Sequence, residues 1–197
     1  MQQMSAMKLL GSPTSPYVRR IRLLLGDTPY EFTILDIYGP DRDVLRAHNP
    51  ALKVPMLIDD DFGVYDSRVI ARYLAAKLGL EPLSWAQENQ LTLIDAVNDS
   101  GVTLALSKRS GIDLDQDAMF HDLQRERIRL SIDALSAQAA EGAFDSWHYP
   151  SICLYCMVDW MELRGLFDFT EHQPLLAMRE RHANRPLIAE TDPRNAG

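Results

Sequence analysis

The chain has 197 residues, of which 46% are hydrophobic and 24% are charged, and its formal net charge is −8. This composition is ordinary for a globular protein, and the length suffices for one large domain or two small ones. The negative charge argues against a general binder of nucleic acids or anionic membranes. Because no apolar run approaches roughly eighteen residues, no membrane-spanning helix is expected.

The cysteine count and the first residues predict a cytoplasmic protein. Residues 1–6 lack a basic segment followed by an apolar core, so no signal peptide is expected. Two cysteines do not make a disulfide framework in a chain of this length. Cys153 and Cys156 have a C-x-x-C spacing, but they lie within an apolar run and have no second pair. We therefore expect two packed thiols and no metal site.

The first structured stretch predicts a strand, a turn and a helix. The apolar run at residues 7–11 is typical of a buried strand. Apolar residues spaced three or four apart over residues 16–25 indicate an amphipathic helix. Ser15 falls at the N-cap of this helix and Pro16 at its first position. A hydroxyl there faces unpaired N–H groups and the positive end of the helix dipole, which favours an anion, although a Ser–Pro pair alone is usually only a cap.

The remainder of the first half alternates short strands and helices. Strands are expected at residues 30–37, 53–58 and 64–65, and helices at residues 41–48 and 67–78. The resulting order, β-α-β-α-β-β-α, is sufficient for a small α/β domain.

Beyond residue 79 the strand patterns disappear and long helical patterns replace them. A linker near residues 79–87 is followed by helices expected at residues 85–107, 115–140, 151–164 and 174–184. The helix at residues 151–164 is apolar on most sides, which predicts a buried central helix. The three tryptophans, Trp85, Trp147 and Trp160, are expected to pack in the core. The second half is therefore predicted to be an all-α domain.

Three motifs in this order resemble the glutathione S-transferase family. Ser15-Pro16-Tyr17 lies where the family places its reactive residue before a proline and an aromatic residue. The segment from Asn49 to Pro55 resembles the Asn-Pro…Val-Pro segment, whose last proline follows a cis peptide bond. Tyr65-Asp66-Ser67 resembles the signature of an acidic residue plus serine before the third helix. The resemblance, which covers residues 7 to about 190, implies a thioredoxin-like glutathione-binding domain at 7–79 and an all-helical domain at 87–190.

Ser15 is the catalytic residue that the resemblance implies. Its hydroxyl would donate a hydrogen bond to the glutathione thiolate, and this bond would favour the ionised sulfur. Ser12 and Thr14 lie close by in the sequence, so either of them remains an alternative. A serine cannot form a mixed disulfide, which disfavours glutaredoxin-like exchange.

Five further residues are implied in binding glutathione: Lys53, Val54, Pro55, Asp66 and Ser67. Val54 precedes a proline that interrupts the ladder, so its N–H and C=O can pair with an extended peptide. Lys53 can reach the glycine carboxylate. Asp66 can bind the γ-glutamyl ammonium, and Ser67 with the helix N-terminus can bind the adjacent carboxylate.

The activity implied is conjugation of glutathione, as co-substrate, to a small apolar electrophile by a detoxifying homodimer. The alternative is a non-catalytic module that is similar to the stringent starvation proteins, which contact RNA polymerase. Besides the serine in place of a cysteine at the reactive position, two further positions depart from the family pattern. Leu52 stands where glycine is frequent, and Ser151 keeps the serine of a helix-capping motif whose Asp is replaced by Leu154. Loss of that Asp would cost about 0.5–2 kcal/mol unless another group replaces it.

Overall fold

The structure, a computed structural model, describes residues 7–116 and 118–195. The opening residues 1–6, in which no signal peptide is expected, lie outside this range. Two compact units are present. The first comprises the described residues up to Pro82 and those from Arg185 onwards, and the second comprises Leu83–Asn184. The predicted fold class, an α/β unit followed by an all-α unit, is confirmed.

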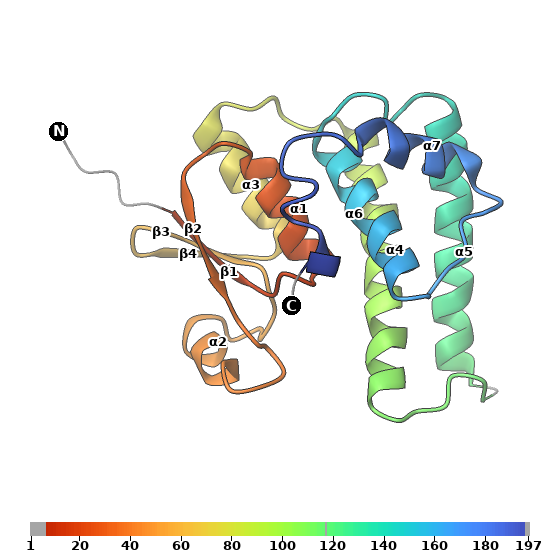
Figure 1. The fold of residues 1–197 in the computed structure, drawn as a ribbon, viewed down its shortest axis with the longest axis horizontal. Coiled ribbons are helices and arrows are strands. Elements are labelled where there is room, and N and C mark those ends of the chain that lie inside the picture. Colours follow the sequence, from red (N-terminus) through yellow and green to blue (C-terminus); the bar gives the residue numbers. More distant parts are fainter. Residues whose placement is uncertain (1–6, 117, 196–197) are drawn as a thin grey trace. The chain divides into compact units, whose positions relative to one another are not determined.

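The first unit is built on a four-stranded sheet in the order β2-β1-β3-β4. Its strands are β1 (Met7–Gly11), β2 (Tyr30–Ile34), β3 (Met56–Asp59) and β4 (Phe62–Tyr65). β1 is parallel to β2 and antiparallel to β3, and β3 is antiparallel to β4, as Figure 1 shows. β2 and β4 are therefore the edges of the sheet.

Among its described residues, the first unit also contains three α-helices: α1 (Pro16–Leu25), α2 (Arg42–His48) and α3 (Ser67–Leu78). Leu45 of α2 packs with Leu10 and Met56 in a buried cluster on one face of the sheet. Because alternate residues of a strand point to opposite faces, the fully buried Leu9 and Leu57 lie on the other face. α1 and α3 pack against each other.

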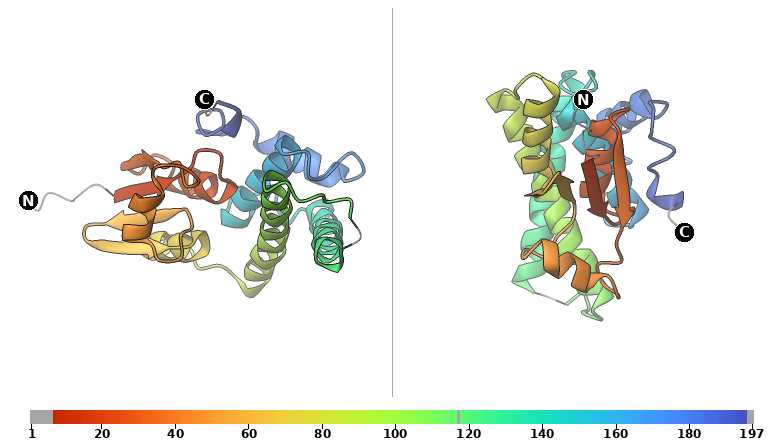
Figure 2. Two further views of the ribbon diagram at one scale, coloured as in Figure 1. Left: turned by 90° about the horizontal axis from the view of Figure 1, so that it is seen from below. Right: turned by 90° about the vertical axis from the view of Figure 1, so that its left-hand side faces the viewer.

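In the part of the second unit that the structure describes there are four helices: α4 (Trp85–Arg109), α5 (Met119–Ala140), α6 (Tyr149–Leu163) and α7 (Gln173–His182), which Figure 2 shows from two further sides. α4 packs against α5 and α6, and α7 packs against α5 and α6. Every residue of α6 from Tyr149 to Met161 is buried, which confirms the predicted central helix. Gly101 of α4 permits the close approach of α6, because a Cβ there would lie 2.6 Å from Sδ of Met161. No helix among residues 7–116 and 118–195 combines the length and hydropathy needed to cross a bilayer.

Several local predictions require correction. Trp85 is 86% exposed at the first position of α4, so it does not pack in the core, whereas Trp160 does. α5 begins at Met119 rather than residue 115, because the Asp113 side chain accepts from the Asp115 N–H and holds a turn there. β3 begins at Met56 rather than residue 53, after a cis Val54–Pro55 bond.

The C-terminal residues return to the α/β unit. Residues 185–190, which the sequence assigns to the helical domain, group with the sheet, together with a short 3-10 helix, η1 (Pro193–Asn195). The reason is a long-range contact: the Arg19 guanidinium donates to the Thr191 hydroxyl and to the Ile188 carbonyl oxygen. A contact between residues so far apart has no local sequence signal.

Candidate functional site

Ser15 is the N-cap of α1, as the sequence predicts. Its backbone is extended, and its Oγ accepts a hydrogen bond of 3.4 Å from the Val18 N–H. Because the oxygen is the acceptor in this bond, the hydroxyl proton remains available for a ligand in front of the helix. The side chain is half-buried, so a small molecule can reach it.

The two alternative hydroxyls, Ser12 and Thr14, bond to each other. Their side-chain oxygens are 3.0 Å apart, and the Thr14 N–H donates to the Ser12 Oγ at 3.4 Å. One of the two protons is used in this pair, whereas the Ser15 hydroxyl combines a proton for donation with a place at the helix N-terminus. The geometry therefore favours Ser15 as the group that contacts an anion.

The segment before β3 presents an open stretch of main chain at Val54. The Val54–Pro55 peptide bond is cis. Within the described residues, neither the N–H nor the C=O of Val54 has a hydrogen-bond partner. Unpaired main-chain groups beside a sheet can accept an extended peptide as an additional strand.

Asn49 holds this segment in place, a role that the sequence reasoning missed. Its side-chain nitrogen donates to the Lys53 carbonyl at 2.8 Å, and its Oδ1 accepts from the Ala51 N–H at 3.0 Å. Asn49 is almost completely buried although it is polar. The sequence signal for this segment is its resemblance to the Asn-Pro…Val-Pro pattern, which does not indicate the hydrogen bonds that the Asn49 side chain makes.

Asp66 is the N-cap of α3, and Ser67 is the first residue of that helix. The Asp66 Oδ1 accepts from the N–H groups of Arg68 and Val69 at 2.9 and 3.3 Å. Oδ1 thus caps the helix, and the second carboxylate oxygen, Oδ2, takes no part in these two hydrogen bonds. Ser67 is buried, whereas Asp66 is exposed. Asp66 has a φ of 71°, a backbone conformation that a non-glycine residue adopts only under tertiary constraint.

Strand register brings these groups to one end of the sheet. Leu10 of β1 pairs with Met56 of β3, and Met56 pairs with Tyr65 of β4. The chain leaves β1 towards Ser15, enters β3 from Pro55 and leaves β4 towards Asp66. All three segments therefore leave or enter the sheet at the same end of its strands, and Lys53 adds an exposed cation there.

Sequence comparisons find similar proteins for the first unit and for the whole chain. Residues 9–82 match the family model described as glutathione S-transferase, N-terminal domain. The uncharacterized GST-like protein YibF of Escherichia coli is 28% identical over 96% of this chain and 100% of its own length. The chain is therefore similar to the glutathione S-transferases, and its α/β unit matches their N-terminal domain.

Solved glutathione S-transferases share the fold along nearly the whole chain. A family member from Pseudomonas fluorescens Pf-5 with bound glutathione is 26% identical, with a TM-score of 0.80 over 95% of this chain and 99% of its own. A glutathione S-transferase from Methylobacillus flagellatus, also with glutathione bound, has a TM-score of 0.81 at 24% identity, covering 95% of this chain and 100% of its own.

The first departure from the glutathione S-transferase pattern has a backbone explanation. Leu52, which stands where glycine is frequent, has a φ of 53°. This left-handed region is readily available to glycine and costly for a leucine. Leu52 therefore holds a backbone conformation that a glycine would adopt more readily.

The second departure is compensated by a histidine. α6 begins at Tyr149, so its N-cap is His148 and Ser151 is the third helical residue. The His148 Nδ1 accepts from the Ser151 N–H at 3.2 Å, and its Nε2 lies 3.2 Å from the Ala143 carbonyl oxygen. The imidazole therefore provides the capping acceptor, and burial lowers its pKa below the ordinary 6.5.

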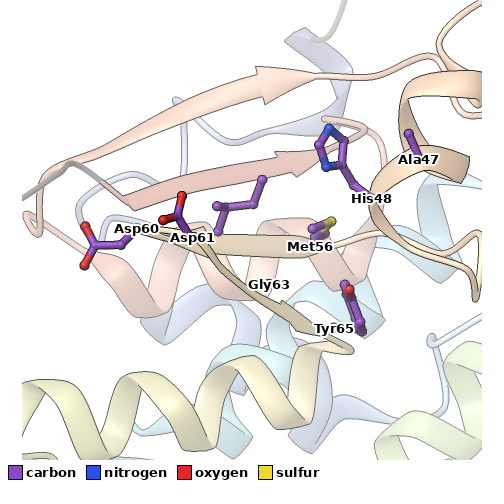
Figure 3. Close-up of a pocket in the computed structure, with 8 residues that line it drawn as sticks. Ala47, His48, Met56, Asp60, Asp61, Gly63 and Tyr65 are labelled. Atoms are coloured by element: carbon purple, nitrogen blue, oxygen red, sulfur yellow. The ribbon is translucent and has the colours of Figure 1, made fainter.

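A hollow of about 300 Å³ lies beside β3 and β4, next to α2 (Figure 3). His48 and Met56 lie at one end, and Asp60 and Asp61 border the other (Figure 3). None of the six residues predicted for the glutathione site lines it.

Two other clusters bear on chemistry. Cys153 and Cys156 are buried in α6 and are not joined in a disulfide, which confirms the expected packed thiols. In the described part of the chain, no three His, Cys, Asp or Glu side chains gather as metal ligands.

Asp59 is buried beneath α3, where it pairs with Lys77 and accepts from the Tyr73 hydroxyl at 2.5 Å. Burial raises the Asp59 pKa, but these two donors outweigh that effect and lower it overall.

Proposed function

We propose that this protein is a glutathione transferase that conjugates the glutathione thiolate to a small apolar electrophile. The observation that carries the proposal is the meeting of three segments at one end of the strands of the sheet. They are the Ser15 N-cap, the cis-proline segment with its unpaired Val54 main chain, and the Asp66–Ser67 helix start. The two solved relatives described above contain glutathione.

In the proposed complex the tripeptide lies against Val54 as an added strand. Pro55 interrupts the strand pairing of the protein's own chain, so the Val54 main chain stays open to the ligand. Lys53, an exposed cation beside Val54, binds the glycine carboxylate. The second oxygen of Asp66 accepts from the γ-glutamyl ammonium. The N-terminal amides of α3 with the Ser67 hydroxyl bind the neighbouring carboxylate.

The Ser15 hydroxyl donates its hydrogen bond to the sulfur, and the N-terminus of α1 adds a positive potential. Both effects favour the thiolate over the thiol, whose proton passes to solvent. The thiolate then attacks an electrophilic carbon, forming a carbon–sulfur bond while the electron pair leaves with the departing group or moves into the acceptor. The protein contributes position and anion stabilisation.

A homodimer in the cytoplasm is part of the proposal. Several large apolar side chains remain exposed in each unit, among them Phe62 and Val69 in the first and Leu123 and Leu130 in the second. Exposed apolar surface of this kind is typical of subunit interfaces. Light scattering coupled to gel filtration would report twice the chain mass, and a monomer at all concentrations would contradict this part.

The central experiment measures glutathione binding by calorimetry and conjugation of glutathione to a chloronitrobenzene by absorbance. We expect binding, turnover, and a gain of about 2.7 kcal/mol in the free energy of unfolding at one hundred times the dissociation constant. A protein that neither binds glutathione nor gains stability from it would contradict the proposal. That result would favour the non-catalytic alternative, a stringent-starvation-like binding module.

A further inference from the structure

The last described residues form a folded segment of their own, which we call the C-terminal strap (residues 185–195). The Leu187 carbonyl accepts from both the N–H and the hydroxyl of Thr191, at 2.9 and 2.7 Å. The Asn195 side chain donates to the Ala189 carbonyl at 3.1 Å. Leu187 has a φ of 67°, which a leucine adopts only where surrounding contacts require it. The strap therefore has a definite shape that tertiary contacts maintain.

The strap is attached to α1 through Arg19. The Arg19 Nε donates to the Thr191 Oγ1 at 3.2 Å, and its Nη2 donates to the Ile188 carbonyl at 3.0 Å. Arg19 is 3% exposed and Thr191 is 2% exposed. A buried guanidinium requires hydrogen-bond acceptors, so the strap supplies part of what this charge needs. In Figure 1 the dark blue end of the chain turns back towards α1.

Arg19 is also joined directly to Ser15. Its N–H donates to the Ser15 carbonyl at 3.0 Å, which is the hydrogen bond that begins the helix. The adjacent Val18 N–H donates to the Ser15 side chain. A single residue thus connects the strap with the first turn of α1, on which the Ser15 hydroxyl depends for its position.

We propose that the C-terminal strap is a positioning element for Ser15, with Arg19 and Thr191 as its positioning residues. By bonding to Arg19, the strap holds the first turn of α1 closed and keeps the Ser15 hydroxyl aimed at the sulfur of the ligand. The functional half of this inference rests on the proposed glutathione transferase activity. The structural half, protection of the first turn by the strap, does not.

A physical need for such an element follows from the first turn itself. Helix ends fray, and the first turn of α1 contains no acidic side chain to bind its N–H groups or complement the dipole. A hydrogen bond that stabilises a thiolate depends on donor position within a few tenths of an ångström. Tertiary anchoring one turn into the helix restricts this motion.

The test compares Thr191→Val, which removes one acceptor of Arg19 together with the hydroxyl's own bond to the Leu187 carbonyl, with Thr191→Ser, which keeps both. The matched control is Thr103→Val on α4, where the hydroxyl bonds only to the Asp99 carbonyl of its own helix. The first readout is hydrogen exchange at the Val18 and Arg19 amides. We expect about tenfold faster exchange in Thr191→Val, because loss of a hydrogen bond to a charged group shifts an opening equilibrium by at least this factor. Thr191→Ser and Thr103→Val should match the wild type.

The second readout is the pKa of the bound glutathione thiol, followed by ultraviolet absorbance of the thiolate. In Thr191→Val we expect this pKa to rise towards that of unbound glutathione and kcat to fall about tenfold, with KM for glutathione nearly unchanged. Arg19→Lys, which keeps the charge but not the two-point attachment, should behave in the same way.

Unchanged exchange of the Val18 and Arg19 amides in Thr191→Val would overturn the positioning role. Faster exchange with an unchanged thiol pKa and kcat would overturn its functional half. A wild-type protein that binds no glutathione would refute the proposed function instead, and the exchange measurement would still decide whether the strap holds the first turn.

Discussion

The side-chain amide of Asn49 donates to the Lys53 carbonyl at 2.8 Å, and this bond shapes the loop that ends in the cis Val54–Pro55 peptide. Asn49 lies at the end of α2, whereas Val54 and Pro55 lie just before β3, at the end of the sheet where glutathione is proposed to bind. Asn49 thus holds the loop that carries Val54, the residue whose main chain is proposed to pair with glutathione.

We predict that Asn49→Ala weakens glutathione binding. The substitution leaves the Lys53 carbonyl and the Ala51 N–H without their partners, which should lower the free energy of unfolding by about 1–3 kcal/mol. Calorimetry should show a several-fold larger dissociation constant for glutathione, and thermal unfolding should show a lower melting temperature. Asn184→Ala, at an exposed position of the second unit, is the control and should change neither.

Ser15→Ala should separate catalysis from binding. Removing a donor that stabilises a developing or resident anion costs roughly 100-fold in kcat in comparable sites. The dissociation constant for glutathione should change only a few-fold, because Val54, Lys53, Asp66 and the α3 N-terminus supply most of the proposed contacts. Steady-state kinetics and calorimetry check both numbers. Ser12→Ala is the matched control, and a larger loss there than in Ser15→Ala would reassign the catalytic hydroxyl.

Asp59 should make stability depend on pH in the acidic range. Its pKa in the folded protein lies below the ordinary 3.8, so the stability it contributes is present above pH 3.8 and is lost as the pH falls through the folded value. Asp59→Asn should remove about 1.5–3 kcal/mol at neutral pH, the magnitude of a hydrogen bond to a charged group. In urea-unfolding experiments at several acidic pH values, Asp59→Asn should also reduce the fall in the free energy of unfolding with decreasing pH, which we call the acid limb. An acid limb that stays as steep in Asp59→Asn would show that another group governs it.

His148 should produce a second pH dependence at a higher pH. Burial lowers its pKa below 6.5, with a smaller contribution from His182, so the neutral cap is fully stabilising above pH 6.5 and is lost as the pH falls through the folded value. Replacing it by asparagine, a good N-cap that does not titrate, should keep α6 capped and remove the stability change in this window. Chemical denaturation of wild type and His148→Asn at several pH values between 5 and 8, a range chosen because histidines titrate within it, measures the difference.

The local elements could be predicted because their signals are local. The N-cap at Ser15, the helical spacing of α1 and the alternation of strands and helices up to α3 follow from neighbouring residues. The expected glutathione contacts came from three motifs that resemble the family pattern, and the register of three strands brings those motifs to one end of the sheet. Whether each of them contacts glutathione stays a prediction.

Other features depended on the direction in which a side chain points, which the neighbouring residues do not determine. The exposure of Trp85 could not be predicted, because a tryptophan at a helix start can lie inward or outward and its own neighbours do not determine which. Likewise, His148 takes over the cap of α6 because its ring turns towards Ser151, a rotamer that the sequence does not encode in any simple pattern.

By itself, the sequence determined which segments are strands and helices, because hydrophobic periodicity and capping residues act over a few positions. Only the tertiary structure decided that residues 185–195 return to the α/β unit and that Arg19 bonds to Thr191 and Ile188. The physical reason is the burial of a guanidinium. Its need for acceptors is met by whichever carbonyl and hydroxyl groups the fold brings to it, and chain order alone does not identify them.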